Sequence, residues 1–151
     1  MLPSFIPTVE RQFTPGINDG DNQGINSIRV KDNVGTYTKN LKLGQNWTIE
    51  VDFMVSGPSV PVLGGDWTLT AIVESIGSGN EKIVSTLTPI PVGSAPLVAN
   101  SRTYLNNLMT VAAGEVSEGG SYRLSIMLTH TNLGVQTENV CFAHGPVLHF
   151  A

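Results

Sequence analysis

The sequence predicts an all-β fold: a single antiparallel β-sandwich, immunoglobulin-like or related, with seven to nine strands. Segments in which apolar and polar side chains alternate recur at short intervals along the 151 residues, and this period of two is the pattern of half-buried strands. Glycine and proline separate the segments. Amphipathic helical spacing is found nowhere along the chain. Many short strands without helices indicate a sandwich or a small barrel.

Residues 1–16 are expected to form an extended N-terminal arm, ahead of a sandwich domain at residues 17–151. Three prolines interrupt this stretch, and proline cannot donate a hydrogen bond to a strand ladder. The arm is unusually apolar for a tail, so we expect it to lie along its own domain or to contact a neighbouring chain. The candidate interface side chains are Phe5, Ile6, Val9 and Phe13.

Residues 17–26 are expected to form a polar loop. Asp19 and Asp21, followed by Gly24, resemble the start of a calcium-binding loop, and the two aspartates are therefore candidate metal ligands. Val30 stands where that motif places a glutamate, so a turn rich in Asn, Asp and Gly is the favoured interpretation. Short strands are expected next, around the turn at residues 31–33, within residues 27–38.

The central stretch, residues 46–75, contains two strongly alternating strands. Residues 47–55 place Trp, Ile, Val, Phe and Val on one face, and residues 67–73 place Trp, Leu, Ala and Val on one face. A connection rich in Gly and Pro joins them. We expect the two strands to pair at the centre of a sheet, with their apolar faces on the core.

Further strands are expected along the rest of the chain. Lys82 suggests that the first of them lies near a sheet edge, and Gly145-Pro146 suggests a bulge or kink in the last. Residues 89–96 are expected to form a loop or an edge crossing. The expected strands are residues 81–88, 103–111, 121–131 and 140–150.

Two resemblances add to this pattern. The run GEVSEGGSYRLSIMLT resembles the corner of immunoglobulin-like sandwiches in which a Tyr hydroxyl, here that of Tyr122, bonds back to the main chain. The motifs GGDWTLTAIVESIGSG and FAHGPVLHF resemble an uncharacterised group of small β-proteins from cyanobacteria and other bacteria, over roughly Trp47 to the C-terminus. This second resemblance implies a bacterial origin and a single β-domain, and it assigns no site or activity.

Composition excludes several classes of function. The net charge is −4, with no basic patch, which disfavours nucleic acid and anionic membrane surfaces as partners. Cys141 is a single cysteine, too few for a disulfide framework or a cysteine-based zinc site. Neither a signal peptide nor an 18-residue apolar span is recognisable. We expect a soluble protein, cytoplasmic unless it is exported without a signal peptide or as part of a particle.

Possible catalytic groups are few. Glu50 and Asp52 share a strand face, and Glu74 is expected beside them on the paired strand. Such acids can hydrolyse glycosides or bind a divalent cation, but the polar outer face of a sheet is the favoured interpretation. A Cys141 nucleophile with His144 as its base is disfavoured, because neighbours on one strand rarely have that geometry.

The histidines lack the spacing of a zinc site. His144 and His149 lie five residues apart on one expected strand, so they point to opposite faces unless the kink between them realigns the strand. The third histidine, His130, falls in the expected strand at residues 121–131. The aromatic residues at 37, 47, 67, 104 and 122 are possible sugar-stacking platforms, although the two tryptophans alternate in phase with the core.

With no catalytic signature, the sequence favours a non-catalytic structural or assembly module without a cofactor. Such a module would form a homo-oligomer or dock on another protein through sheet edges and the apolar arm. Low charge also leaves the sheet edges with little protection against pairing. Apolar side chains in the turn at residues 60–63 and the loop at residues 89–96 are expected to add contact patches. The alternative is a carbohydrate- or calcium-binding module.

Overall fold

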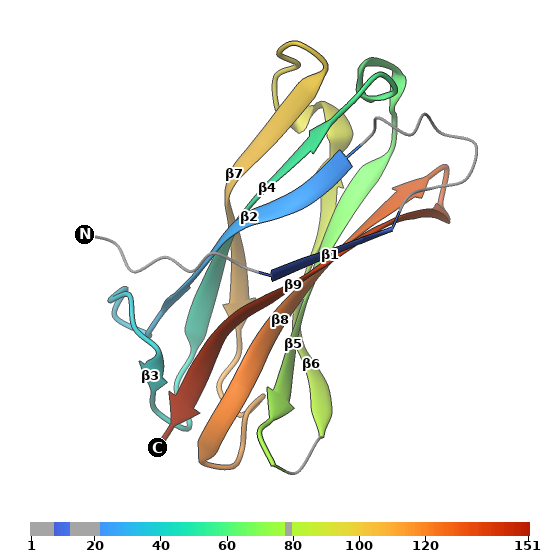
Figure 1. Cartoon of the computed structure of the whole chain (residues 1–151). Coiled ribbons are helices and arrows are strands. Elements are labelled where there is room, and N and C mark those ends of the chain that lie inside the picture. Colours follow the sequence, from blue (N-terminus) through green and yellow to red (C-terminus); the bar gives the residue numbers. More distant parts are fainter. Residues whose placement is uncertain (1–7, 13–21, 78–79) are drawn as a thin grey trace.

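The computed structural model has two β-sheets packed face to face (Figure 1). It describes residues 8–12, 22–77 and 80–151, and of residues 8–12 and 138 only the backbone. The described part contains nine strands and two short 3-10 turns, η1 (Val60–Val62) and η2 (Val92–Ser94). The strands are β1 (Thr8–Gln12), β2 (Asn22–Lys31), β3 (Asn40–Leu41), β4 (Trp47–Ser56), β5 (Asp66–Ser75), β6 (Glu81–Pro91), β7 (Ser101–Val111), β8 (Gly120–Asn132) and β9 (Val135–Phe150).

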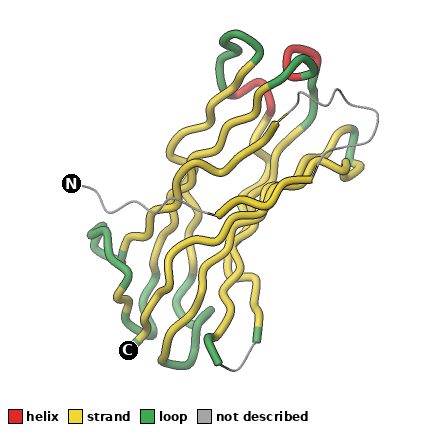
Figure 2. Tube along the Cα trace, viewed as in Figure 1, coloured by secondary structure: helices red, strands yellow, loops and turns green. Residues whose placement is uncertain are grey.

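The larger sheet has the strand order β1-β9-β8-β5-β6, and the smaller sheet has the order β2-β4-β7. All these neighbours pair antiparallel. The two-residue strand β3 pairs parallel with the end of β9. Strands therefore account for most of the trace in Figure 2, with loops at the two ends. The predicted all-β sandwich is confirmed.

The core lies between the sheets and is built by the predicted alternation. On β4 the inward residues 47, 49, 51, 53 and 55 are buried, and on β5 residues 67, 69, 71 and 73 are buried. Phe53 packs edge-on against Trp67 of the facing sheet, with ring centroids 6.1 Å apart, and stacks on Tyr104 of its own sheet at 4.5 Å. Aromatic pairs of this geometry add to the stabilisation from buried area.

The expected pairing of the two central strands is wrong. β4 belongs to the smaller sheet and β5 to the larger, so they face each other across the core instead of sharing a ladder. The connection at residues 57–65 includes η1 and crosses from one sheet to the other. Two strands joined by a hairpin need a loop of only two to five residues. The two sheets are stacked about 10 Å apart, and the longer connection at residues 57–65 spans that separation.

The region before β4 also differs from expectation. β2 begins at Asn22, inside the segment expected to be a polar loop, and Ile25 is buried. A bulge between Ile25 and Ser27 breaks the alternation there. Residues 34–38 form a turn rather than a strand. A single bridge joins Lys31 to Tyr37, and the Asp32 carboxylate accepts two main-chain hydrogen bonds of the turn.

Later parts of the chain agree with the predictions. β6 is the terminal strand of its sheet, as Lys82 suggested, although it continues to Pro91. β9 contains the predicted bulge, because its register against β8 shifts between Arg123 and Ser125. The Tyr122 hydroxyl donates a 2.7 Å hydrogen bond to the Glu118 carbonyl, as a corner tyrosine does.

Most aliphatic residues of the two segments proposed as contact patches are buried. Val60 of the first segment is buried, and so are Ile90, Val92 and Ala95 of the second. Val62 is 85% exposed, Leu63 is half-buried, and the prolines of both segments are exposed. These loops close the end of the core, and only part of their apolar surface remains available for contacts.

Candidate functional site

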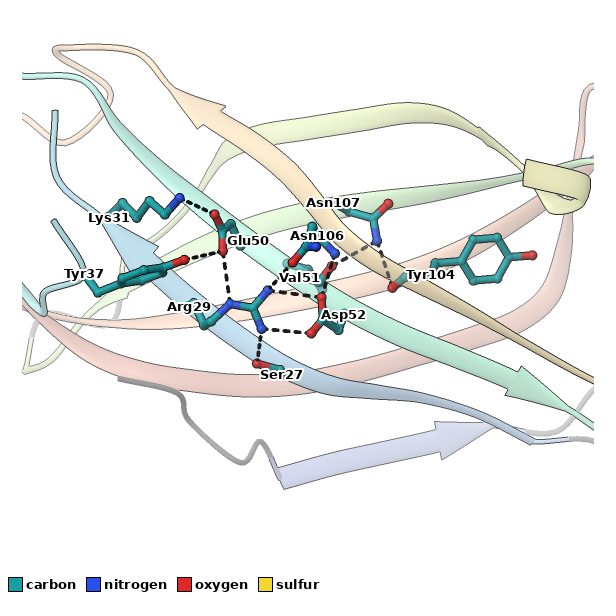
Figure 3. A network of polar contacts seen from close by, with 10 residues as sticks. All are labelled: Ser27, Arg29, Lys31, Tyr37, Glu50, Val51, Asp52, Tyr104, Asn106 and Asn107. Atoms are coloured by element: carbon teal, nitrogen blue, oxygen red, sulfur yellow. Dashed lines mark hydrogen bonds and ion pairs between the residues drawn. The ribbon is translucent and has the colours of Figure 1, made fainter. Parts of the chain in front are cut away.

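A polar network lies on the outer face of the smaller sheet (Figure 3). Arg29 of β2 donates from Nη1 and Nη2 to the Asp52 carboxylate of β4, at 2.8 and 3.1 Å. Its Nε donates to Glu50, also on β4, at 3.1 Å. Further donations reach the Ser27 hydroxyl at 2.8 Å and the Asn106 side-chain oxygen at 3.1 Å. The planar fork of the guanidinium suits this two-pronged binding of a carboxylate.

Glu50 has two further partners. Lys31 of β2 forms an ion pair with Oε1. The Tyr37 hydroxyl donates to Oε2 at 3.0 Å, and the Lys31 ammonium lies 4.9 Å from the centre of the Tyr37 ring. The turn after β2 therefore folds back over the sheet, which explains why Glu50 is buried on a face expected to be solvated.

The same network supports a bulge in β7. Asn106 has a positive φ of 56°, and the register between β4 and β7 shifts there. The Asp52 carboxylate accepts the Asn106 main-chain N–H at 2.7 Å. The Asn107 side-chain amide donates to the carbonyls of Val51 and Tyr104, at 2.9 and 3.2 Å. These side chains satisfy main-chain groups that the bulge removes from the ladder.

Both acids are held in their charged forms. Burial opposes ionisation of Glu50, but hydrogen bonds from Lys31, Arg29 and Tyr37 outweigh it, so its pKa lies below the usual value. Burial also opposes ionisation of Asp52, and the hydrogen bonds from Arg29 and Asn106 likewise lower its pKa. The pKa of Arg29 is raised, chiefly by its bond to Asp52, and that of Lys31 by its bond to Glu50.

This network pairs two cations with two anions, so its net charge is zero. Each of its carboxylates already accepts from a basic side chain: Asp52 from Arg29, and Glu50 from Arg29 and Lys31. Glu74, expected beside the two acids, lies on β5 of the other sheet. The three acids are therefore not brought together, and the network is best understood as a device that ties β2, β4 and β7 to one another.

The histidines of β9 lie on the outer face of the larger sheet. His144 Nδ1 is 3.0 Å from the Ser125 hydroxyl and His149 Nδ1 is 2.8 Å from the Ser121 hydroxyl. Ser121 and Ser125 are four residues apart on β8, so both histidines share a face, because the bulge realigns β9 as the kink hypothesis allowed. Cys141 is fully buried in the core, on the side of β9 away from His144.

His130 is a buried residue of β8. Its Nε2 lies 2.7 Å from the Gly64 carbonyl and its Nδ1 lies 3.0 Å from the Thr137 hydroxyl. The ring packs on Trp67 with centroids 4.8 Å apart. His130 therefore connects the β8–β9 hairpin to the connection between β4 and β5. Among the described residues, no three His, Cys, Asp or Glu side chains are placed to hold a metal ion.

Three of the five aromatic candidates for sugar stacking belong to the core. Trp47, Trp67 and Tyr104 are each at most 3% exposed. Trp67 Nε1 donates to the Tyr104 hydroxyl at 3.3 Å. The Tyr104 hydroxyl in turn donates to the Val92 carbonyl at 2.5 Å. Burial raises the pKa of Tyr104. Tyr37 and Tyr122 are half-buried and serve the polar network and the corner.

A shallow depression of about 200 Å³ lies at the end of the sandwich near the β5–β6 hairpin. Its lining includes Lys82, which forms an ion pair with Glu115 at 3.1 Å. Neither Glu50, Asp52 nor His144 contributes to it. The depression thus brings none of the sequence-based catalytic candidates together.

Several predicted residues lie outside the described part of the chain. These are the calcium candidates Asp19 and Asp21 and three of the interface candidates, Phe5, Ile6 and Phe13. The fourth, Val9, lies in β1, whose backbone pairs with β9 from Thr8 opposite His144 to Gln12 opposite Val140. These assignments stay predictions.

Sequence reasoning missed Arg29 and Lys31, which hold the acids of β4. A signal was present, because both alternate with the apolar residues 28 and 30 and so share the outer face of their strand. The pairing of this strand with β4 could not be predicted from the sequence. The alternation identified the face, but only the register, with Arg29 opposite Glu50, identifies the partner.

No helix in the described part of the chain is long and apolar enough to cross a membrane. No protein-family model and no curated protein matches the sequence. Solved structures do match the fold. One is described as "Crystal structure of the C-terminal domain of wzt"; it superposes with a TM-score of 0.62 and 11% sequence identity, over 96% of this chain and 78% of that one. This likeness establishes the fold that the two chains share, a two-sheet β-sandwich.

Proposed function

We propose that this chain is a non-catalytic structural and assembly module, which self-associates through a sheet edge and its N-terminal arm, residues 1–16. The observation that supports this most is the position of β1. It is the terminal strand of the larger sheet, five residues long, and among the described residues it forms a ladder with β9 alone. A short strand at the edge of a sheet that pairs along a single side is the type of element that neighbouring copies can exchange.

Exchange of β1 requires no new surface. The arm of one copy would meet the same five positions on β9 of the next copy, residues 140–144, that it meets in its own domain. Without β1, the outward N–H and C=O groups of residues 140–144 on β9 would lose the strand partner that the structure shows for them, and an uncovered edge favours pairing with another chain. The native ladder thus supplies the register for association.

An immunoglobulin-like arrangement forms part of this proposal. The bond from the Tyr122 hydroxyl to the Glu118 carbonyl supports it. The carbohydrate- or calcium-binding alternative has less support. Both tryptophans are in the core, and Glu50 and Asp52 are occupied by basic side chains.

The test is the molar mass in solution of the full chain and of a variant lacking residues 1–13, measured by light scattering after gel filtration. We expect the full chain to be oligomeric and the shortened chain to have a lower mass, with its sheet content retained in circular dichroism. A monomer in both cases, with unchanged thermal stability, would contradict the proposal.

A further inference from the structure

Two polar residues of the inner face lie in one row across the smaller sheet. Gln23 of β2 pairs with Val55 of β4, and Val55 pairs with Arg102 of β7. Directly opposed residues of antiparallel strands project to the same face of the sheet. Val55 is 3% exposed and belongs to the core, so Gln23 and Arg102 also start from the inner face. The nitrogens Gln23 Nε2 and Arg102 Nε are here called the donor pair.

The donor pair is buried without hydrogen-bond acceptors. Neither nitrogen is in contact with solvent, and neither has an acceptor among the described residues. Burial of an N–H group costs stability when the hydrogen bonds to water that it gives up are not replaced. Such atoms are rare in folded proteins, and each requires an explanation. The two that are found in the described part of the chain fall in the same row, which indicates one cause for both.

Arg102 is a half-buried cation. Its Nη1 donates to the Ala95 carbonyl, in the connection between β6 and β7. Burial raises the pKa of Tyr104 and the charge of Arg102 opposes that rise, so the guanidinium lies near this core hydroxyl. No acidic side chain of the described residues forms an ion pair with Arg102, whereas Arg29 of the same sheet is paired with two carboxylates.

The remaining edge of the guanidinium has the geometry of a carboxylate site. With Nη1 bonded to Ala95, Nε and Nη2 form that edge, and its two parallel N–H groups match the two oxygens of a carboxylate. The Gln23 amide can donate a further hydrogen bond to the same ligand. One cation balances one negative charge. A monocarboxylate therefore fits, whereas a phosphate dianion would bring in a buried charge without a counterion.

A buried water molecule is the competing occupant. Water can accept from both nitrogens, but it leaves the charge of Arg102 unbalanced. The segments beside Arg102, residues 57–65 and 92–100, are joined by the hydrogen bond from the Gly57 N–H to the Asn100 carbonyl. Both segments lack Asp and Glu. A ligand that supplies an acceptor and a negative charge together explains more of this row than water does.

We propose that the donor pair is a binding site for a small monocarboxylate, which accepts from the Nε edge of Arg102 and from the Gln23 amide. The Cα atoms of the two residues are two strand spacings apart, about 10 Å, a distance that two long side chains and one small ligand can span. Arm exchange uses residues 140–144 of β9, so this inference does not depend on the assembly proposal.

Nuclear magnetic resonance of the full chain tests the site directly, because the N–H groups of the donor pair have their own 1H–15N signals. Sodium acetate should shift the signals of Arg102 Nε and Gln23 Nε2 together, with one dissociation constant. Sodium chloride and sodium phosphate, at matched ionic strength, should need concentrations at least about tenfold higher. If acetate moves neither signal, moves the Arg102 signal alone, or acts no better than chloride, the proposal is overturned.

The variant Arg102→Lys tests the edge of the guanidinium. It keeps the positive charge but removes Nε, so the affinity for acetate, followed by the Gln23 signal, should fall at least about tenfold. The matched control is Arg123→Lys, at an exposed position on β8, and it should bind acetate like the original chain. Equal affinities in the two variants would overturn the proposal. Should Arg102→Lys fail to fold, the titration of the original chain decides.

Gln23→Leu gives a readout in the absence of ligand. Leucine is of similar size and has no buried donor to satisfy, so in buffer without carboxylate the melting temperature should be equal or higher. Acetate stabilises the chain that binds it, so it should raise the melting temperature of the original chain more than that of Gln23→Leu. An equal rise in both chains would show that the amide does not contact the ligand, and it would overturn the assigned site.

Discussion

Arg29 of β2 and Asp52 of β4 share two hydrogen bonds, of 2.8 and 3.1 Å, on the outer face of the smaller sheet. Their side chains are only 10% and 15% exposed. This pair joins neighbouring strands, and through Asn106 it also fixes the bulge of β7. The stability of the smaller sheet should therefore depend on Arg29.

Arg29→Met should lower the free energy of unfolding by about 3 kcal/mol, because it leaves two largely buried carboxylates without their shared cation. Urea unfolding measures this change. Lys82→Met is the matched control, since it breaks an ion pair in which the lysine is 55% exposed, and it should lower stability by no more than about 1 kcal/mol. Equal losses in the two variants would contradict the assigned role of Arg29.

The lowered pKa values of Glu50 and Asp52 predict sensitivity to acid. A carboxyl group whose pKa is lower in the folded state stabilises the fold above its unfolded pKa, near 4. That contribution is lost as the pH falls through the folded pKa. The free energy of unfolding should therefore decline below about pH 4, and the decline should be shallower in the double variant Glu50→Gln, Asp52→Asn. If the unfolding free energy falls equally steeply with pH in the original chain and in the double variant, groups other than Glu50 and Asp52 cause the decline.

The Tyr104 hydroxyl connects Trp67 to the Val92 carbonyl inside the core. Tyr104→Phe leaves a buried donor and a buried acceptor unsatisfied, so it should lower stability by about 1–3 kcal/mol. In Tyr122→Phe, the control, only an exposed bond to the Glu118 carbonyl is lost, and the loss should be about 1 kcal/mol or less. A smaller effect for Tyr104 than for Tyr122 would argue against this core network.

Gly65 lies where the connection after β4 meets the β8–β9 hairpin. Its φ is +88°, and an added Cβ would lie 2.1 Å from the Thr131 carbonyl oxygen. Gly65→Ala should lower the unfolding free energy by more than about 3 kcal/mol, from backbone strain and a main-chain clash together. Gly114→Ala has a similar φ of +92° and open space around the new Cβ, so it should cost only about 1 kcal/mol. Thermal unfolding of both variants separates the cost of the backbone strain, which both share, from the cost of the main-chain clash, which only Gly65→Ala has.

Local alternation predicted most of the strands and their buried faces. The inward side of β4, from Trp47 to Val55, and that of β5, from Trp67 to Val73, followed directly from a period of two. The hydrogen bond from the Tyr122 hydroxyl to the main chain and the bulge at Gly145-Pro146 were also predictable, because each depends on a few adjacent residues.

Strand partners were not predictable in the same way. β4 and β5 are neighbours in sequence, yet they belong to opposite sheets, and β4 pairs with β2 and β7. That choice depends on how the whole core packs, to which local propensity contributes little. Alternation correctly predicted that the acids of β4 lie on an outer face. Their ion pairs with Arg29 and Lys31 were missed, because these depend on the pairing of β2 with β4.

The most direct test of the assembly proposal asks whether β1 pairs within its own chain or with the next. Glu10 lies opposite Phe142 in the β1–β9 ladder, and opposed positions in antiparallel strands are close enough for a disulfide. The double variant Glu10→Cys, Phe142→Cys is oxidised and run on a non-reducing denaturing gel. Thr70→Cys, Met127→Cys, opposed in the β5–β8 ladder, is the control and should give only an internal bond. The proposal predicts a covalently linked dimer or a longer ladder of species for the first pair; a fully oxidised band of monomer size alone would contradict it.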